Sequence, residues 1–304
     1  MGITTTRFHP DQRGEVQRFV RFVSSHEGEP ALSEYKEMRL DGRVDAREQV
    51  VLGPNGEVVG YGQAAWHRGT GATPGHWAVE VAVHPDFRDT AAARELIEAF
   101  RLGSDDAGVT LWARSSYVAD AARSIGWRRD RELLEMRRSL PIDCLDASFT
   151  GFNLSTFRMG VDEAAWVEAN NAAFAGHPEN GSMTRRDLED RIAQPWFDAN
   201  GFFLVWDGDD LAASCWTKIH DDGVGEIYII GVVPGWEGYG LGRSLICHGL
   251  EYLGRTRHIA MAKLFVEADN DRAVGLYAGM GFATTRIVEA YRHPQHGSAS
   301  EPSV

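Results

Sequence analysis

The stretch GVVPGWEGYGLGRSL, residues 231–245, lies between an apolar run and the expected start of an amphipathic helix. Its glycines Gly235, Gly238, Gly240 and Gly242 have no Cβ, so successive backbone amides can turn toward one point. The N-terminus of the following helix adds partial positive charge, and such a nest binds phosphate groups. The spacing matches neither G-x-G-x-x-G nor G-x-x-x-x-G-K-S/T, which disfavours a dinucleotide fingerprint and a nucleotide-hydrolysing P-loop. The stretch predicts a phosphate-binding turn, and a tight turn without a ligand is the alternative.

The composition indicates a globular protein, since 43% of the residues are hydrophobic and 25% are charged. The formal net charge of −13 argues against nucleic-acid binding, which requires a basic face. No apolar run approaches the length of a membrane span and no signal pattern is visible, so we expect a cytoplasmic protein that does not bind a membrane. The three cysteines lack metal-ligand spacing, so no metal site is expected.

The parts of the chain occur twice in the same order. In each half an apolar strand leads through a proline, Pro85 or Pro234, into a helical stretch, a second strand and a last strand. Self-similarity of this kind predicts two domains of one α/β fold. We expect the N-terminal domain over 1–145, the C-terminal domain over 146–292, and a polar, disordered tail over 293–304.

Local signals place elements in the second half. Thr184 with Asp187 three positions later forms a capping box, and Pro195 ends the helix that follows. Two alternating segments separated by a turn predict a β-hairpin, which a third strand continues. These strands are expected over 201–206, 211–220 and 226–232.

The glycine turn resembles the pyrophosphate-binding motif Q/R-x-x-G-x-G/A of the GNAT acyltransferase superfamily, with Gly240 and Gly242 at the glycine positions. Glu237 stands where that family has Gln or Arg. A carboxylate beside a pyrophosphate is unfavourable unless it points outward, and Arg243 is expected to offset it.

A second motif supports the same resemblance. The stretch EADNDRAVGLYAGMGF, residues 267–282, matches the superfamily's N-x-x-A-x-x-x-Y helix through Asn270, Ala273 and Tyr277, which fall on one helical face. The resemblance implies two tandem GNAT-fold domains, each a mixed, mostly antiparallel sheet flanked by helices. It also implies an N-acetyltransferase that uses acetyl-CoA as co-substrate.

The resemblance assigns roles to individual residues. Glu226 corresponds to the catalytic glutamate that removes the amine proton, directly or through water, and Tyr277 to the tyrosine that protonates the departing thiolate. The amides of Ile230 and Val232 are expected to hold the thioester carbonyl and pantetheine. An ordinary solvated glutamate and a core-edge tyrosine are the alternatives. Further expected cofactor contacts are Gly231, Gly238, Tyr239, Gly240, Leu241, Gly242, Arg243, Asn270, Arg272 and Ala273.

Over nearly its whole length the chain resembles the mycothiol synthase family of tandem GNAT proteins, most densely over 166–282. That family acetylates the cysteinyl amine of a cysteine–glucosamine–inositol conjugate, so the implied partner is a small-molecule amine. The resemblance places acceptor contacts at Glu179, Lys218, Glu226 and Phe265. Ordinary surface charge is the alternative for Glu179 and Lys218.

Two departures from the family support other hypotheses. Gly181-Ser182-Met183 stands where the family continues with Gly and Trp, and Phe265 stands where it has Tyr. These changes favour a paralogue that acetylates another amine, such as a natural-product intermediate, a hydrazine or an aminoglycoside. A non-catalytic CoA-binding regulatory module is a third hypothesis. Whether the chain is a monomer or a dimer stays open.

The first half has lost the glycines. Its corresponding segment is HPDFRDTAAARE, residues 84–95, whose Cβ atoms would crowd a pyrophosphate. We therefore expect this domain to be non-catalytic. Val81, Ala82 and Val83 are the candidates for a non-productive CoA contact there.

Overall fold

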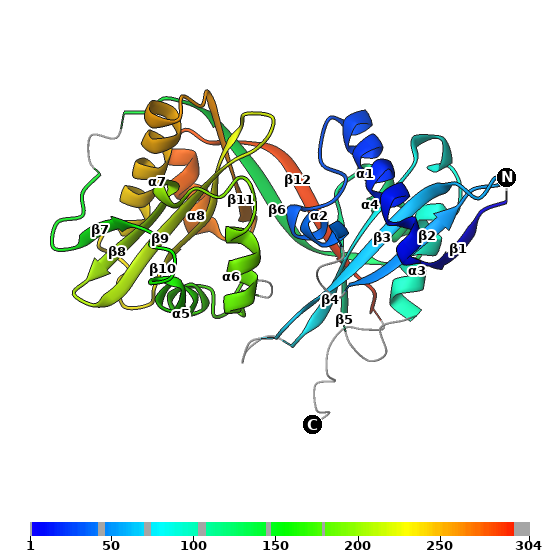
Figure 1. Ribbon diagram of the computed structural model, residues 1–304, viewed down its shortest axis with the longest axis horizontal. Coiled ribbons are helices and arrows are strands. Elements are labelled where there is room, and N and C mark those ends of the chain that lie inside the picture. Colours follow the sequence, from blue (N-terminus) through cyan, green and yellow to red (C-terminus); the bar gives the residue numbers. More distant parts are fainter. Residues whose placement is uncertain are drawn as a thin grey trace. The chain divides into compact units, whose positions relative to one another are not determined.

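The computed structural model describes residues 2–41, 46–69, 74–102, 108–143, 147–177 and 180–294 (Figure 1). They form two compact units, the first within 1–68, 75–132 and 288–304, the second within 69–74 and 133–287. The strands β6 (Arg128–Ser139) and β12 (Ala283–Arg292) contribute residues to both units. Packing therefore does not follow chain order, and the domain boundary near residue 145 stays a prediction. Residues 295–304 of the expected tail lie outside the described residues.

The first unit is built on a sheet in the order β1-β2-β3-β4-β5-β12. β4 and β5 run parallel, and their pairings with β3 and β12 are antiparallel. The other strands of this sheet are β1 (Thr4–Arg7), β2 (Arg47–Leu52), β3 (Val58–His67), β4 (His76–Val83) and β5 (Gly108–Ala113). The helices are α1 (Arg13–Glu27), α2 (Glu34–Glu37), α3 (Ala92–Leu102) and α4 (Ser116–Ser124), with 3-10 turns η1 (Pro10–Gln12), η2 (Met38–Asp41) and η3 (Pro85–Phe87).

Helices cover both faces of this sheet. One apolar cluster contains residues of α3 and α4, and a separate cluster contains residues of α1. α1 buries Val16, Phe19, Val20 and Val23, which recur at helical spacing on one face. It ends at Gly28, whose φ of 69° is the left-handed conformation of a glycine C-cap.

The second unit contains a sheet in the order β6-β11-β10-β9-β8-β7. β10 and β11 run parallel, whereas β9 is antiparallel to both β8 and β10. The other strands of this sheet are β7 (Asn153–Thr156), β8 (Phe202–Asp207), β9 (Asp210–Ile219), β10 (Gly225–Val232) and β11 (Met261–Glu267). The helices are α5 (Glu163–Ala173), α6 (Arg185–Ile192), α7 (Leu241–Glu251) and α8 (Asp271–Gly279), with η4 (Ala199–Gly201) and the π-helical turn η5 (Tyr252–Thr256).

The local predictions in this unit are confirmed. Thr184 and Asp187 form the capping box of α6, and the expected hairpin is β8–β9, which β10 continues. One apolar cluster packs α7 and α8 against the sheet, and another packs α5 and α6 (Figure 1). None of the helices in the described ranges is long and apolar enough to cross a membrane. The expected α/β fold, with mostly antiparallel sheets flanked by helices, is confirmed.

Candidate active site

Three glycines shape the turn between β10 and α7. Gly235, Gly238 and Gly240 have φ angles of 101°, 88° and 76°, and Gly240 is the N-cap of α7. Residues with a Cβ rarely adopt this left-handed region, so the backbone conformation requires glycine. A Cβ built at any of the three meets no heavy atom within 4 Å, so the space beside the turn is open. This is the geometry that a phosphate cradle requires.

The side chain of Glu237 binds the turn itself. Its Oε2 accepts a hydrogen bond of 2.6 Å from the Gly235 N–H. Hydrogen bonds from the backbone N–H groups of Glu237 and Gly235 hold the pKa of this carboxyl below its ordinary value, and Arg272 lowers it further. The carboxylate therefore binds an amide of the turn itself.

β10 and β11 separate just before this turn. Their parallel pairing covers only Gly225 with Ala262 and Glu226 with Lys263, whereas β10 continues to Val232. In the described part of the chain, no strand pairs with this edge of β10 beyond Glu226. The separation leaves a length of strand edge beside the glycine turn.

The amides on that edge can be located from the ladder with β9. The Val233 N–H donates to the Ala212 carbonyl on β9. Because N–H groups alternate sides along a strand, those of Ile230 and Val232 face the β11 side. These are the two amides that the resemblance assigns to the thioester carbonyl.

Glu226 lies where the two strands begin to separate, and only 6% of it is exposed. It is in register with Lys218 on β9 and with Lys263 on β11, both of which are buried. Its Oε2 lies 2.5 Å from His220 Nε2. The solvated-glutamate alternative is therefore wrong, because this carboxylate is buried beside the imidazole of His220.

Lys218 and Phe265 share the sheet face of Glu226. The Lys218 Nζ lies 4.6 Å from the ring centroid of Trp196 and 5.6 Å from that of Tyr228. Successive residues of β11 point to opposite faces of the sheet, so Phe265, two positions after Lys263, lies on the same face as Lys263. The surface-charge alternative for Lys218 is therefore wrong, since only 6% of this residue is exposed.

The loop that carries the first family departure reaches the core. Met183 is buried in the apolar cluster of α5 and α6. The side chain of Asn171 makes two hydrogen bonds of 2.8 Å to the backbone of Met183. It accepts from the Met183 N–H and donates to the Met183 carbonyl. Glu179, a predicted acceptor contact, lies outside the described residues.

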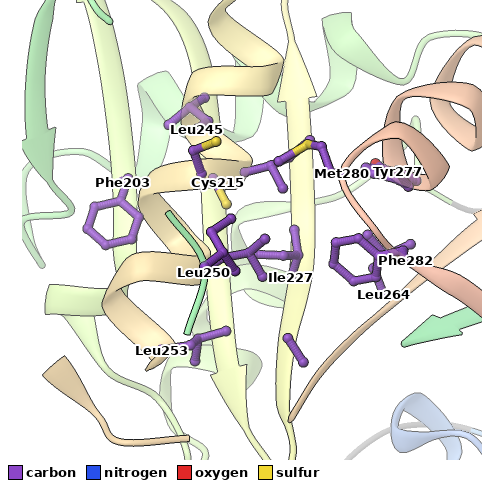
Figure 2. Close-up of a cluster of buried hydrophobic side chains, with 14 of the residues drawn as sticks. Phe203, Cys215, Ile227, Leu245, Leu250, Leu253, Leu264, Tyr277, Met280 and Phe282 are labelled. Carbon is purple, nitrogen blue, oxygen red and sulfur yellow. The ribbon is translucent and has the colours of Figure 1, made fainter. Parts of the chain in front are cut away.

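Tyr277 lies on α8, in the cluster that packs on the opposite face of the sheet. Figure 2 shows it at the edge of this cluster beside Met280 and Phe282. Only 7% of it is exposed, and burial raises the pKa of its phenol to about 12. The phenol is therefore protonated at neutral pH, as a proton donor must be. The open edge of β10 lies between this face and that of Glu226.

The remaining expected cofactor contacts lie at the two helix starts and in the turn before α7, apart from Gly231 in β10. Asn270 is the N-cap of α8 and accepts from the Ala273 N–H at 3.1 Å, so its side chain has a structural role. Leu241 is buried, which leaves its backbone for a ligand. The exposed side chains among them are Tyr239, Arg243 and Arg272, and the glycines are Gly231, Gly238, Gly240 and Gly242.

In the first unit a side chain binds the amide at the corresponding strand end, which is that of β4. The Val83 N–H donates to the Tyr117 hydroxyl at 2.9 Å, and the Arg88 guanidinium lies 4.3 Å from the Tyr117 ring centroid. The segment after β4 forms η3, and none of its residues has a positive φ. The candidate CoA contacts here are all buried, namely Val81, Ala82 and Val83.

Sequence reasoning missed His220, Lys263 and Tyr117. His220 lies two positions after Lys218, so the period of a strand places both on one face. A hairpin between Ile219 and Gly225 then brings the imidazole diagonally opposite Glu226. Nothing in the spacing signals Tyr117, because the residue at its place in the second half is Arg272.

Comparison with known proteins agrees with this geometry. Residues 165–282 match the acetyltransferase (GNAT) family. The structure resembles a tandem GNAT protein from the clavulanic acid biosynthesis pathway, with a TM-score of 0.68 and 16% identity over 98% of this chain and 100% of that one. At this identity the likeness concerns the fold alone, and it confirms the expected tandem GNAT architecture.

Two sequence relatives match almost end to end. The mycothiol acetyltransferase of Streptomyces bingchenggensis is 39% identical over 293 residues, which cover 93% of each chain. That of Geodermatophilus obscurus is 37% identical over 300 residues, covering 94% of this chain and 96% of its own. The chain therefore belongs to the mycothiol acetyltransferase family of GNAT N-acetyltransferases.

Proposed function

We propose that this chain transfers the acetyl group of acetyl-CoA to the cysteinyl amine of a cysteine–glucosamine–inositol conjugate, forming an amide in mycothiol synthesis. One observation carries the proposal: the buried carboxylate of Glu226 lies where β10 separates from β11, on the strand that ends at the glycine turn. The relatives that match the chain almost end to end are named for this activity.

The residues present fit acetyl-CoA, which supplies the acyl group as an activated thioester. Amides of the glycine turn and the N-terminus of α7 suit a pyrophosphate. The outward N–H groups of Ile230 and Val232 suit a carbonyl oxygen that gains negative charge. The exposed guanidinium groups of Arg243 and Arg272 add positive charge at the starts of α7 and α8, which Glu237 partly offsets.

The proton balance gives Glu226 and Tyr277 separate tasks. An acceptor ammonium loses two protons when its nitrogen forms the amide bond and the carbon–sulfur bond breaks. Glu226 takes the first proton and so makes the nitrogen nucleophilic. The protonated phenol of Tyr277 donates to the leaving sulfur and regains a proton from the nitrogen. The net products are an amide, a thiol and one released proton.

The acceptor side is polar and partly aromatic. The ammonium of Lys218 packs against the rings of Trp196 and Tyr228. It can therefore donate to sugar or inositol hydroxyls without a large loss of side-chain freedom. Phe265 offers an apolar surface on the same sheet face. We assign Glu179 to the same pocket on the family resemblance. No metal takes part in this scheme.

The test is acetylation of a panel of amines by the full chain with acetyl-CoA. Products are detected by mass spectrometry, because the acceptor's own thiol interferes with thiol reagents that report CoA. We expect turnover of the cysteinyl conjugate and none of the same conjugate without cysteine. Glu226→Gln should lower kcat by about 10²–10⁴ while acetyl-CoA still binds, measured by calorimetry.

The second candidate is acetylation of a different amine, which Phe265 and the buried Met183 favour. Loss of a tyrosine hydroxyl changes which acceptors a polar pocket selects. Turnover of a hydrazine or an aminoglycoside with inactivity toward the cysteinyl conjugate would favour this candidate. Acetyl-CoA binding without turnover of any amine would instead favour the regulatory module.

A further inference from the structure

His220 is the more exposed neighbour of a buried base. Its side chain is 23% exposed, whereas that of Glu226 is 7% exposed, and His220 Nε2 lies 2.5 Å from Glu226 Oε2. Two buried lysines are in register with Glu226 and so share its sheet face, namely Lys218 from β9 and Lys263 from β11. Of these three basic side chains, only the imidazole of His220 has one ring nitrogen that can accept a hydrogen and another that can donate one.

The β9–β10 turn holds His220 in place. Its N–H donates to the Val224 carbonyl and its carbonyl accepts from the Gly223 N–H, both at 2.9 Å. The Asp222 carboxylate accepts from the Val224 N–H at 3.0 Å. The imidazole is thus attached to a hydrogen-bonded turn on the strand next to that of Glu226, which limits its movement relative to the carboxylate.

We propose that His220 is a positioning residue that orients Glu226 and passes the proton taken from the acceptor amine to solvent. The inference rests on the proposed base Glu226. Each turnover releases one proton, and a buried carboxylate must lose it before the next cycle. The transfer balances: the Glu226 O–H bond breaks as an N–H bond forms on His220 Nε2, and Nδ1–H releases its proton to water or buffer. Proton exchange with solvent then returns the remaining ring proton from Nε2 to Nδ1 for the next turnover.

Kinetics of two variants test the proposal. His220→Ala leaves a space beside Glu226, so we expect kcat to fall about tenfold or more at low buffer concentration and to recover with added imidazole. His220→Gln keeps a side-chain N–H for orientation but cannot relay a proton. Its kcat should fall without rescue by imidazole, and the KM for acetyl-CoA should stay unchanged in both variants.

His84→Gln is the matched control, since His84 is 27% exposed and lies 3.8 Å from the Asp86 carboxylate in the first unit. It should keep the wild-type kcat. Wild-type kcat in both His220 variants at every buffer concentration would overturn the relay. A loss in His220→Ala that imidazole does not restore would also overturn it, because that result indicates a structural role.

A measurement without turnover separates this inference from the proposed function. In nitrogen-15-labelled protein, the His220 ring resonances, assigned with His220→Gln, report the hydrogen bond to Glu226. We expect them to shift in Glu226→Gln, whichever amine is the natural acceptor. Unchanged resonances would overturn the pairing even if the cysteinyl conjugate is acetylated. Shifted resonances with an inactive conjugate would leave the pairing supported and the acceptor wrong.

Discussion

Replacement of Tyr277 by phenylalanine removes one hydroxyl from the apolar cluster that packs α7 and α8 against the sheet. It should change the stability at alkaline pH and the kcat. Tyr277 is 7% exposed, and burial raises its pKa from 10.0 to about 12. In the unfolded chain the phenol ionises near its ordinary value, while in the folded protein it stays protonated. Stability from this residue is therefore complete below about pH 10 and is lost as the pH rises to about 12.

The magnitude follows from linkage. One pKa unit is worth about 1.36 kcal/mol, so wild type should lose up to about 2.7 kcal/mol of unfolding free energy over this range that Tyr277→Phe does not lose. Urea denaturation at about pH 9 and about pH 12 measures the difference. The same substitution should lower kcat by about 10²-fold or more if the phenol protonates the leaving sulfur.

Tyr117→Phe is the matched control, because burial also raises the pKa of Tyr117 to about 12 but this residue lies in the first unit. Tyr117→Phe should also reduce the loss of unfolding free energy at alkaline pH, but its kcat should equal that of wild type. Parallel stability curves for wild type and Tyr277→Phe would refute a buried, protonated phenol. An unchanged kcat would refute the role of Tyr277 as the acid.

Three further predictions concern the cofactor turn, the first unit and the core. Glu237→Gln should lower the calorimetric Kd for acetyl-CoA severalfold, because a charge that opposes the pyrophosphate is removed; a higher Kd would mean that the carboxylate is needed to order the turn. Titration of the full chain should find one acetyl-CoA site, since Tyr117 already occupies the Val83 N–H; two sites of equal affinity would contradict this. Gly249→Ala should lower the free energy of unfolding by about 1–3 kcal/mol, because its Cβ would lie 2.9 Å from Ile227 Cδ1. Equal or higher stability in urea would show that the core around α7 can relax.

The elements that sequence reasoning placed correctly are those with local signals. The capping box of Thr184 with Asp187 and the strand–glycine–helix order around Gly240 depend on neighbouring residues. The exchange of residues between the units through β6 and β12 depends instead on pairings between distant segments. Hydrophobic period alone cannot specify such pairing, so a boundary drawn along the chain could not show it.

The candidate site was predictable to the same extent. Glu226 and Lys218 could be named from a family motif, but the motif does not show that Lys263 is in register with Glu226 from a strand 37 residues further along the chain. The hydrogen bond between Glu237 and the turn could not be predicted for a related reason. The Glu237 carboxylate accepts a hydrogen bond from the N–H of Gly235, a residue with a positive φ. The spacing of residues in the sequence does not predict this contact.

The two halves use one equivalent amide differently. His84 donates to Val59 across the ladder in the first unit, as Val233 donates to Ala212 in the second. The preceding amides, on Val83 and Val232, therefore face the opposite strand edge. The same strand position thus carries an outward N–H in both units.

Among the residues that the structure describes, only the first unit provides a hydrogen-bond partner of its own for this amide. An amide N–H shielded from water without a partner costs about 1–3 kcal/mol, and the Tyr117 hydroxyl removes this cost at Val83. A ligand carbonyl would have to displace Tyr117 there and would gain little. At Val232 no side chain among the described residues performs this task, so a bound thioester makes a hydrogen bond that the chain itself lacks. The first unit thus differs from the second in two ways: its segment after β4 lacks the glycines, and Tyr117 binds its outward amide. Both differences weaken CoA binding there, so we expect catalysis in the second unit alone.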